Sequence, residues 1–116
     1  MPWVNLDDQF PEHPTNDALS DAAFRLQVAG ICYCNRHLTD GHVPAAKVPR
    51  LIPRFRRQVL DELLVKHWHM NGNDEYVIRD YLQWNKSRAE ITEERERLHK
   101  MRSEAGKKGA ASRWQT

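Results

Sequence analysis

The spacing of apolar residues predicts a long, centrally placed helix early in the chain. Between Ser20 and about His37, apolar side chains surround much of the helical circumference: Phe24, Leu26, Val28, Ile31 and Tyr33. Such a distribution is typical of a helix that is buried on several sides. Ser20 is a good N-cap residue, and the sequence Thr39-Asp40-Gly41 predicts a turn at the end of the helix.

Two further helices are expected in the next part of the chain. The first covers residues 44–51, where Pro44 fits the first turn and Pro49 shortens or distorts the helix. Pro53 then opens a helix over residues 54–66, whose apolar side consists of Phe55, Val59, Leu60, Leu63 and Leu64. Helical spacing places Arg56 within this apolar arc. Its guanidinium can reach solvent only because Arg56 lies in the first turn or because its long side chain extends outward.

A β-hairpin is expected over residues 67–82, directly after the third helix. Asn71-Gly72 is a strong hairpin turn signal, because both residues tolerate positive φ. Val43 is expected in a short β segment, and residues 3–6 alternate weakly, as a short strand does. Residues 10–16 hold two prolines and are expected to form an ordered loop.

The C-terminal part of the chain carries the signals of one charged helix and a basic tail. Ser87-Arg88-Ala89-Glu90 has the composition of a capping box. The helix is expected over residues 86–105, with a narrow apolar stripe of Ile91, Leu98, Met101 and Ala105. Glu94 interrupts the heptad spacing of this stripe, so the seam of a coiled-coil dimer is incomplete. Residues 106–116 are expected to form a flexible basic tail.

The order of these elements predicts an α+β fold. A helix, a short β segment, two helices and a hairpin in succession are the plan of a winged helix-turn-helix, with a small antiparallel β-hairpin as its wing. This domain is expected over residues 1–85, and the charged helix and the tail follow it. A length of 116 residues suits one such small domain with these additions.

Composition excludes several classes of protein. The mean hydropathy is −0.81, and no apolar stretch approaches the roughly 18 residues that a transmembrane helix needs, so no membrane partner is expected. The N-terminus lacks the basic and apolar regions of a secretory signal. Cys32 and Cys34 are the only cysteines, which excludes a disulfide framework and favours the cytoplasm.

The net charge of +2 conceals two basic segments. Residues 47–57 include no acid and five bases: Lys47, Arg50, Arg54, Arg56 and Arg57. Residues 100–116 hold one acid, Glu104, and again five bases: Lys100, Arg102, Lys107, Lys108 and Arg113. Each segment is either an electrostatic footprint for phosphate or a solvated protein face.

The first basic segment coincides with the helix that a winged helix inserts into the major groove. That helix is expected to begin with four residues able to contact DNA: Arg54, Arg56, Arg57 and Gln58. Arginine can bind guanine bidentately, and glutamine can bind adenine in the same way. Phosphate contacts are expected from two residues that precede the helix, Lys47 and Arg50.

The hairpin tip and the tail supply the remaining candidate DNA contacts. Asn71 and Asn73 at the tip are expected to make a weak contact at most, because the tip lacks Lys and Arg and includes Asp74. Three residues of the tail are expected to hold phosphates in a salt-dependent way: Lys107, Lys108 and Arg113. Alternatively, the tail is a linker or a partner-binding helix.

The sequence contains little evidence for a metal site or a catalytic site. Four residues of zinc-ligand type share a short window: Cys32, Cys34, His37 and His42. The side chains of two cysteines that are two residues apart on a helix point in different directions. Cys32 is therefore expected to be a small buried hydrophobic residue and not a zinc ligand. His67 and His69 alternate on a strand without a visible third ligand. No phosphate-binding loop, serine elbow or His-Glu-x-x-His run occurs, so a non-enzymatic protein without a cofactor or a metal is expected.

Several stretches of the chain together carry a family resemblance: Leu19–Leu26, Leu38–Pro44, Val59–Leu64, Ile78–Asn85, and Ser87–Glu90 before a charged helix and Gly106-Lys107-Lys108-Gly109. On these stretches the chain resembles the N-terminal winged-helix domain of phage and prophage replication-initiation proteins of the replisome-organiser type. The resemblance spans about Trp3 to Arg113 and implies binding of duplex DNA at an origin or operator. Related proteins continue into a further segment, so a role without replisome loading is also open.

Two functions follow from these patterns. The first is a non-enzymatic protein that binds double-stranded DNA in replication initiation or transcriptional control. The second is a protein-interaction module of the same fold that docks a replication or host protein, with five candidate docking residues: Trp3, Trp68, Trp84, Ile91 and Leu98. A homodimer through the C-terminal helix is a further expected association.

Overall fold

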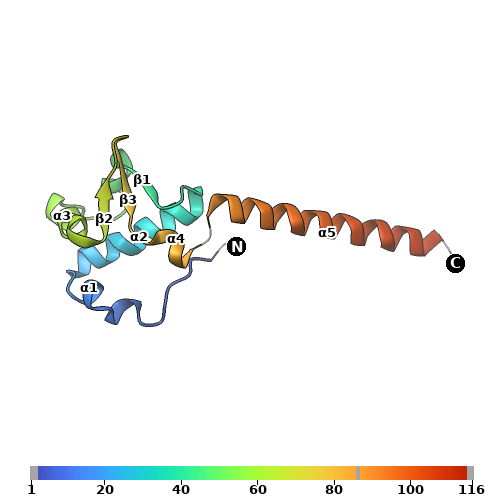
Figure 1. Cartoon of the computed structure of the whole chain (residues 1–116), viewed down its shortest axis with the longest axis horizontal. Helices are drawn as coiled ribbons and strands as arrows, with labels where there is room; N and C mark the ends of the chain where they lie inside the picture. Colours follow the sequence, from blue (N-terminus) through green and yellow to red (C-terminus); the bar gives the residue numbers. More distant parts are fainter. Residues whose placement is uncertain (1–2, 86, 115–116) are drawn as a thin grey trace. The chain divides into compact units, whose positions relative to one another are not determined.

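The computed structural model describes residues 3–85 and 87–114, and their side chains except at residues 84 and 107–114. It divides into two compact units, Met1–Lys86 and Ser87–Thr116. The second unit contains the helix α5 (Arg88–Trp114). The first unit contains, in order along the chain, η1 (Phe10–Glu12), α1 (Pro14–Asp17), α2 (Asp21–His37), β1 (His42–Pro44), η2 (Ala45–Arg50), α3 (Arg57–Lys66), β2 (Trp68–Met70), β3 (Glu75–Ile78) and α4 (Tyr81–Trp84) (Figure 1). The expected α+β class is therefore confirmed.

Helix α2 has the ends that the sequence predicted. The Ser20 Oγ accepts a hydrogen bond from the Ala23 backbone N–H at 3.2 Å, which caps the first turn. Leu38 adopts the left-handed conformation, with φ at 54°, and its N–H bonds to the Cys34 carbonyl. Gly41 follows with φ at 91°, where the absence of a Cβ also avoids crowding against Tyr81. The turn expected over residues 39–41 is thus present.

A contact distant in the sequence joins the start of α2 to α3. The carboxylate of Glu62 accepts hydrogen bonds from both the backbone N–H of Ser20, at 3.0 Å, and its Oγ–H, at 2.6 Å. These bonds hold the pKa of Glu62 below its usual range, because they stabilise the ionised carboxylate. Glu62 therefore extends the N-cap of α2 from a second helix and fixes α3 against it.

The three strands form one antiparallel sheet in the order β1-β3-β2. Trp68 pairs with Ile78 and Met70 with Tyr76, which confirms the expected hairpin. The turn differs from the Asn-Gly type. The residue with positive φ is Asp74, at 55°, and the Asn71 Oδ1 accepts a bond from the Asn73 N–H at 3.0 Å. The Asn71 N–H bonds to the Glu75 carbonyl at 3.0 Å and closes a loop of three residues, 72–74, with a left-handed residue at its end.

Trp68 is the centre of the core and has no exposed surface. Its indole packs over Gly30 of α2, where an added Cβ would lie 2.5 Å from Cζ2. The indole N–H donates a hydrogen bond to the buried Gln27 side chain, which satisfies both polar groups. Tyr76 lies beside the indole, with ring centroids 6.4 Å apart. Trp68 is consequently unavailable for the docking role that the sequence suggested.

The N-terminal segment departs from the prediction. Residues 3–7 form no strand. Residues 10–16, expected as a loop, lie mostly in the short helices η1 and α1. In Figure 1 this segment passes along the side of α2 that faces away from the hairpin tip. Phe10 holds it there, because its ring packs against Phe24 with centroids 5.6 Å apart. Apolar anchoring to α2 therefore replaces the strand pairing expected from alternation.

Three other boundaries differ from the predicted ones. The second helix is a 3₁₀ helix, in agreement with distortion by Pro49. The third helix begins at Arg57 instead of Arg54, because Phe55 packs against the core from the non-helical link before it. The end of the predicted hairpin becomes the short helix α4, since Asp80 takes φ of 61° and ends the strand direction.

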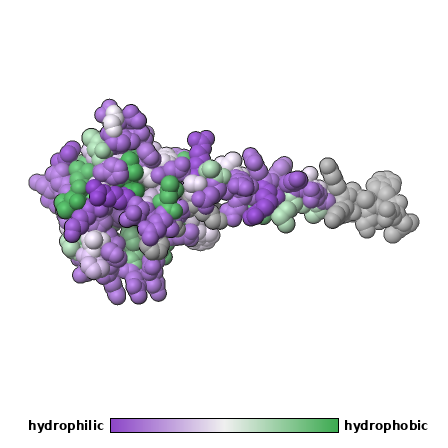
Figure 2. Space-filling model, in the orientation of Figure 1, coloured by the Kyte–Doolittle hydropathy of each residue, from purple (hydrophilic) through white to green (hydrophobic). Residues whose placement is uncertain are grey.

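The second unit is a single long helix with a charged surface. The Ser87 Oγ accepts a bond from the Glu90 N–H at 3.2 Å, so the expected N-terminal cap is present. The helix continues to Trp114, beyond its expected end at Ala105 and through most of the segment expected as a flexible tail. Leu98 and Met101 of the apolar stripe are 46% and 58% exposed. The face drawn in Figure 2 is mainly hydrophilic over the described residues, with separate apolar patches.

Replacement of Gly30 by Ala should destabilise the first unit. Alanine normally stabilises a helix interior by about 1 kcal/mol, but the new methyl group has to displace the Trp68 indole. We expect a net loss of about 1–2 kcal/mol in the free energy of unfolding, measured by urea denaturation. Gly72→Ala is the control, because a Cβ there meets no atom within 4 Å. A Gly30→Ala variant as stable as the wild type would contradict this packing.

Glu62→Gln should weaken the junction of α2 and α3 in a pH-dependent way. The amide retains one acceptor but loses the charge, and an exposed cap of this kind contributes about 1 kcal/mol. Because the folded pKa of Glu62 is lowered, its contribution is present at neutral pH and is lost as the pH falls through that pKa. The difference in urea midpoints between variant and wild type should shrink toward about pH 3. A difference that does not change with pH would contradict the role of the Glu62 charge.

Candidate nucleic-acid interface

The basic residues of the first segment gather around the start of α3. Lys47 and Arg50 lie on η2, Arg54 and Arg56 lie in the link that follows, and Arg57 is the first residue of α3. All five side chains are exposed. Among the described residues, Arg57 is the one member of this basic cluster that forms an ion pair. The other four charges are therefore available to an anionic partner.

The N-terminus of α3 adds to this positive potential. Its first turn contains no acidic residue, and the N-cap residue Arg56 provides no side-chain hydrogen bond to the first amides. The first N–H groups of a helix carry a partial positive charge and suit an anion such as phosphate. The side chains of Arg57 and Gln58 are exposed at this end of α3. Helix and cluster thus present one positively charged surface.

The late start of α3 changes the roles expected for two arginines. Arg54 and Arg56 were expected inside the helix, where they would face base edges, but they precede it. Arg56 has φ of −135° and ψ of 147°, which are extended values. Its side chain is exposed, so the expected conflict with the apolar arc does not arise. On the helix itself, Arg57 and Gln58 remain as the predicted base-contacting residues.

Arg57 is held by its own helix. Its Nε lies 3.1 Å from the Asp61 Oδ1, one helical turn later, and the two side chains are 67% and 56% exposed. This bond raises the pKa of Arg57, and the side chain of Tyr76 on β3 contributes in the same direction. The pairing was not anticipated from the sequence, although the spacing of four residues is a recognisable signal.

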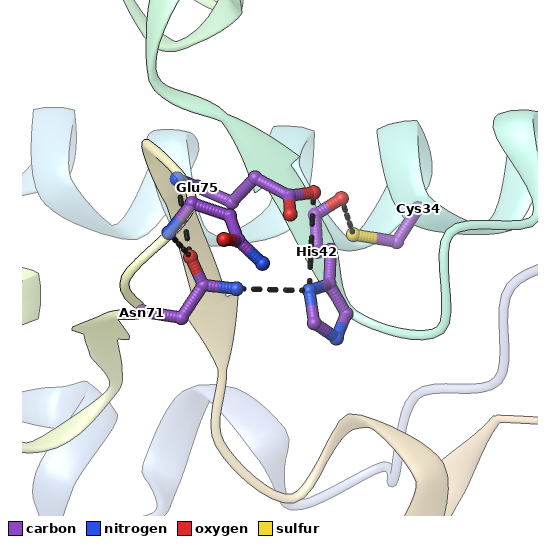
Figure 3. Close-up of polar contacts among 5 residues, drawn as sticks. Cys34, His42, Asn71 and Glu75 are labelled. Carbon is purple, nitrogen blue, oxygen red and sulfur yellow. Dashed lines mark hydrogen bonds and ion pairs between the residues drawn. The ribbon is translucent and has the colours of Figure 1, made fainter.

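Hydrogen bonds between residues of the hairpin itself stabilise its tip. The Asn71 Oδ1 accepts bonds from the N–H groups of Asn73, at 3.0 Å, and Glu75, at 3.3 Å. The Asn71 Nδ2 lies 3.4 Å from the His42 Nδ1, which in turn lies 3.9 Å from the Glu75 Oε2 (Figure 3). Asn71 is therefore engaged in the loop, while Asn73 is exposed and is the tip residue better placed for an external contact.

The predicted tail contacts lie on α5. The backbone of residues 107, 108 and 113 is helical, and the side chains of Lys107, Lys108 and Arg113 lie outside the described part of the chain. Their expected phosphate contacts remain a prediction from the sequence. The helical backbone favours a basic helical segment over a flexible arm.

The cysteine and histidine residues do not form a joint site. Cys34 is buried, and its thiol points to the His42 carbonyl oxygen at 3.6 Å (Figure 3). Burial raises the pKa of Cys34 to about 11, so the thiol stays protonated and weakly nucleophilic at neutral pH. His67, predicted on a strand, instead caps the end of α3 before β2 begins, with its Nε2 3.0 Å from the Asn16 Oδ1. In the described residues no group of three or more metal-ligating side chains comes together.

A cavity of about 410 Å³ lies beneath the N-terminal segment. Its walls come from residues 5–16, α2, the junction of α3 with β2, and residues 78–85, so no local sequence signal identifies it. The charged residues that line it balance: Lys66 and Arg79 against Asp7 and Asp80. None of the basic cluster lines this cavity. It therefore does not suit a polyanion, and the positively charged surface around α3 is the better candidate.

Comparison with known proteins found no match for this chain: no protein-family model matches it, and no match was found among curated proteins or solved structures. The resemblance to replisome organisers accordingly stays a prediction from the sequence. Within residues 3–85 and 87–114, no helix combines the length and the apolar character that a membrane crossing requires.

The environments of the two cysteines predict different reactivity. Cys34 is buried and has a raised pKa, whereas Cys32 is only half-buried. At pH 7 a thiol reagent should modify Cys32 within minutes and Cys34 only on the timescale of local unfolding. Mass spectrometry of peptides from the Cys32→Ser and Cys34→Ser variants would assign each rate. Equal rates in the folded protein would contradict the burial of Cys34.

Proposed function

We propose that this chain is a non-enzymatic winged-helix protein that binds double-stranded DNA. The observation that carries the proposal is the basic cluster around the uncapped start of α3, in which four of the five charges form no ion pair among the described residues. A surface of this kind attracts a polyanion and releases its counterions on binding.

The element order supports the winged-helix interpretation. Helix α2, strand β1, the helices η2 and α3, and the hairpin β2–β3 follow one another, and β1 joins the sheet beside β3. In this interpretation η2 and α3 form the helix-turn-helix, and the hairpin is the wing. The 3₁₀ form of η2 makes the first helix shorter than predicted.

Contacts with DNA divide by position. Arg57 and Gln58, at the start of α3, would face base edges in the major groove. The residues on η2 and in the link would hold phosphates: Lys47, Arg50, Arg54 and Arg56. At the wing, Asn73 would approach the backbone. The proposed setting is replication initiation or transcriptional control, as the resemblance implies.

Exposed apolar side chains favour a second candidate function, docking of a protein. Val65 on α3 is 71% exposed and Met70 at the end of β2 is 54% exposed. Trp3 is also exposed, whereas the side chain of Trp84 lies outside the described residues. On α5, the exposed residues Leu98 and Met101 would serve a homodimer or a replication or host protein. Association that survives high salt and nuclease treatment would favour this candidate.

Arg57→Ala should reduce both affinity and sequence preference. Selection of binding sites from random duplex DNA would first define the preferred sequence, and gel-shift titration would then compare it with a scrambled duplex. We expect at least tenfold weaker binding to the preferred site, with a smaller loss on the scrambled duplex. An unchanged preference would contradict the role of Arg57 in base recognition.

The double variant Lys107→Ala, Lys108→Ala is the matched comparison, because phosphate contacts carry no sequence information. It should weaken binding to both duplexes equally and reduce the dependence of log affinity on log salt. If the wild-type protein at micromolar concentration and low salt binds no duplex, the proposed function is wrong.

A further inference from the structure

An acidic residue stands on the surface of α3 that would face DNA. Helix α3 has two carboxylates, and that of Glu62 is turned toward Ser20. Asp61 is instead 56% exposed, on the same side of the helix as Arg57. A carboxylate at this position repels phosphate and reduces general affinity for nucleic acid. A favourable interaction of Asp61 with a neighbouring side chain would offset this cost.

The Arg57–Asp61 pair provides such an interaction. The Asp61 Oδ1 accepts the bond from the Arg57 Nε at 3.1 Å. The pair uses the Nε, and the two terminal nitrogens of the guanidinium carry further N–H donors that can act as a fork. Recognition of guanine uses two parallel N–H groups directed at O6 and N7, which such a fork supplies.

Tyr76 on β3 belongs to the core of the first unit. It is only 4% exposed and packs beside Trp68 in the core, so its position is fixed. The restraint on Arg57 itself comes from α3, because Asp61 binds its Nε at 3.1 Å. A long arginine side chain held at this nitrogen loses less entropy when its remaining donors bind a partner.

We propose that Asp61 is a positioning residue, which orients Arg57 for bidentate recognition of a guanine at one fixed place in the DNA site. The inference rests on the proposed function. The positioning role and an effect of charge alone predict different results when Asp61 is removed. If Asp61 acted only as a negative charge, its removal would strengthen binding to every duplex. If it positions Arg57, its removal lowers the preference for the guanine.

The experiment compares two duplexes: the selected site, and the same site with the guanine pair opposite Arg57 changed to an adenine–thymine pair. Fluorescence anisotropy gives the affinity of each for the full-length wild type, Asp61→Ala, Asp61→Asn and the control Asp8→Ala. Asp8 is exposed and distant in sequence from α3, so it reports the effect of one lost negative charge. Circular dichroism and thermal melting confirm that each variant is folded.

We expect Asp61→Ala to lower the ratio of the two affinities about tenfold, while affinity for the altered duplex is unchanged or increased. Asp61→Asn retains an Oδ1 acceptor and should restore part of the ratio. In an Arg57→Ala background, Asp61→Ala should no longer change the ratio, because the residue that it positions is absent. Asp8→Ala should leave the ratio at its wild-type value.

The outcomes separate this inference from the proposed function. If the wild type binds no duplex, the proposed function fails and the inference fails with it. If the wild type binds, but Asp61→Ala strengthens binding to both duplexes equally, DNA binding stands and the positioning role is overturned. A selected site without a preferred guanine, or a change in the ratio that persists in the Arg57→Ala background, also overturns the positioning role alone.

Discussion

The packing of Trp68 on Gly30 is the contact on which the rest of the first unit depends. Trp68 opens β2 immediately after α3, so its placement sets both the end of that helix and the base of the hairpin. The indole can approach α2 so closely only because Gly30 has no Cβ, and Gln27 satisfies its N–H inside the core. One side chain thereby joins helix, sheet and hairpin.

A second contact, between Glu62 and Ser20, attaches α3 to the start of α2. Glu62 bonds to Ser20 at the start of α2, while Trp68 packs against the same helix farther along. Two attachments to one helix remove the freedom of α3 to rotate about its axis. The apolar residues Val59, Leu60 and Leu63 are then buried, and the opposite side of α3 is held outward. The orientation of the candidate interface is therefore a consequence of the core.

Local signals in the sequence predicted a large part of this fold. Ser20 and the turn at residues 39–41 defined α2, and periodicity identified α3 and the hairpin, because capping and amphipathicity act over a few residues. The Ser20–Glu62 bonds and the Gly30–Trp68 packing were not predicted, since each joins residues about 40 positions apart. The start of α3 was misplaced for the same reason: Phe55 is drawn to a core that only the folded chain forms.

The corrected start of α3 sharpens what the basic cluster can do. Had the helix begun at Arg54, three arginines would have shared the position that reads bases. Arg54 and Arg56 lie in the link that precedes the helix. In the proposed complex, most of the positive charge would therefore meet phosphate, and base recognition would fall to Arg57 and Gln58. A binder of this composition gains affinity mainly through counterion release, and its selectivity depends on how well one arginine is oriented. Under the proposed function, the Asp61 carboxylate would therefore lower general affinity for DNA and raise the specificity of binding.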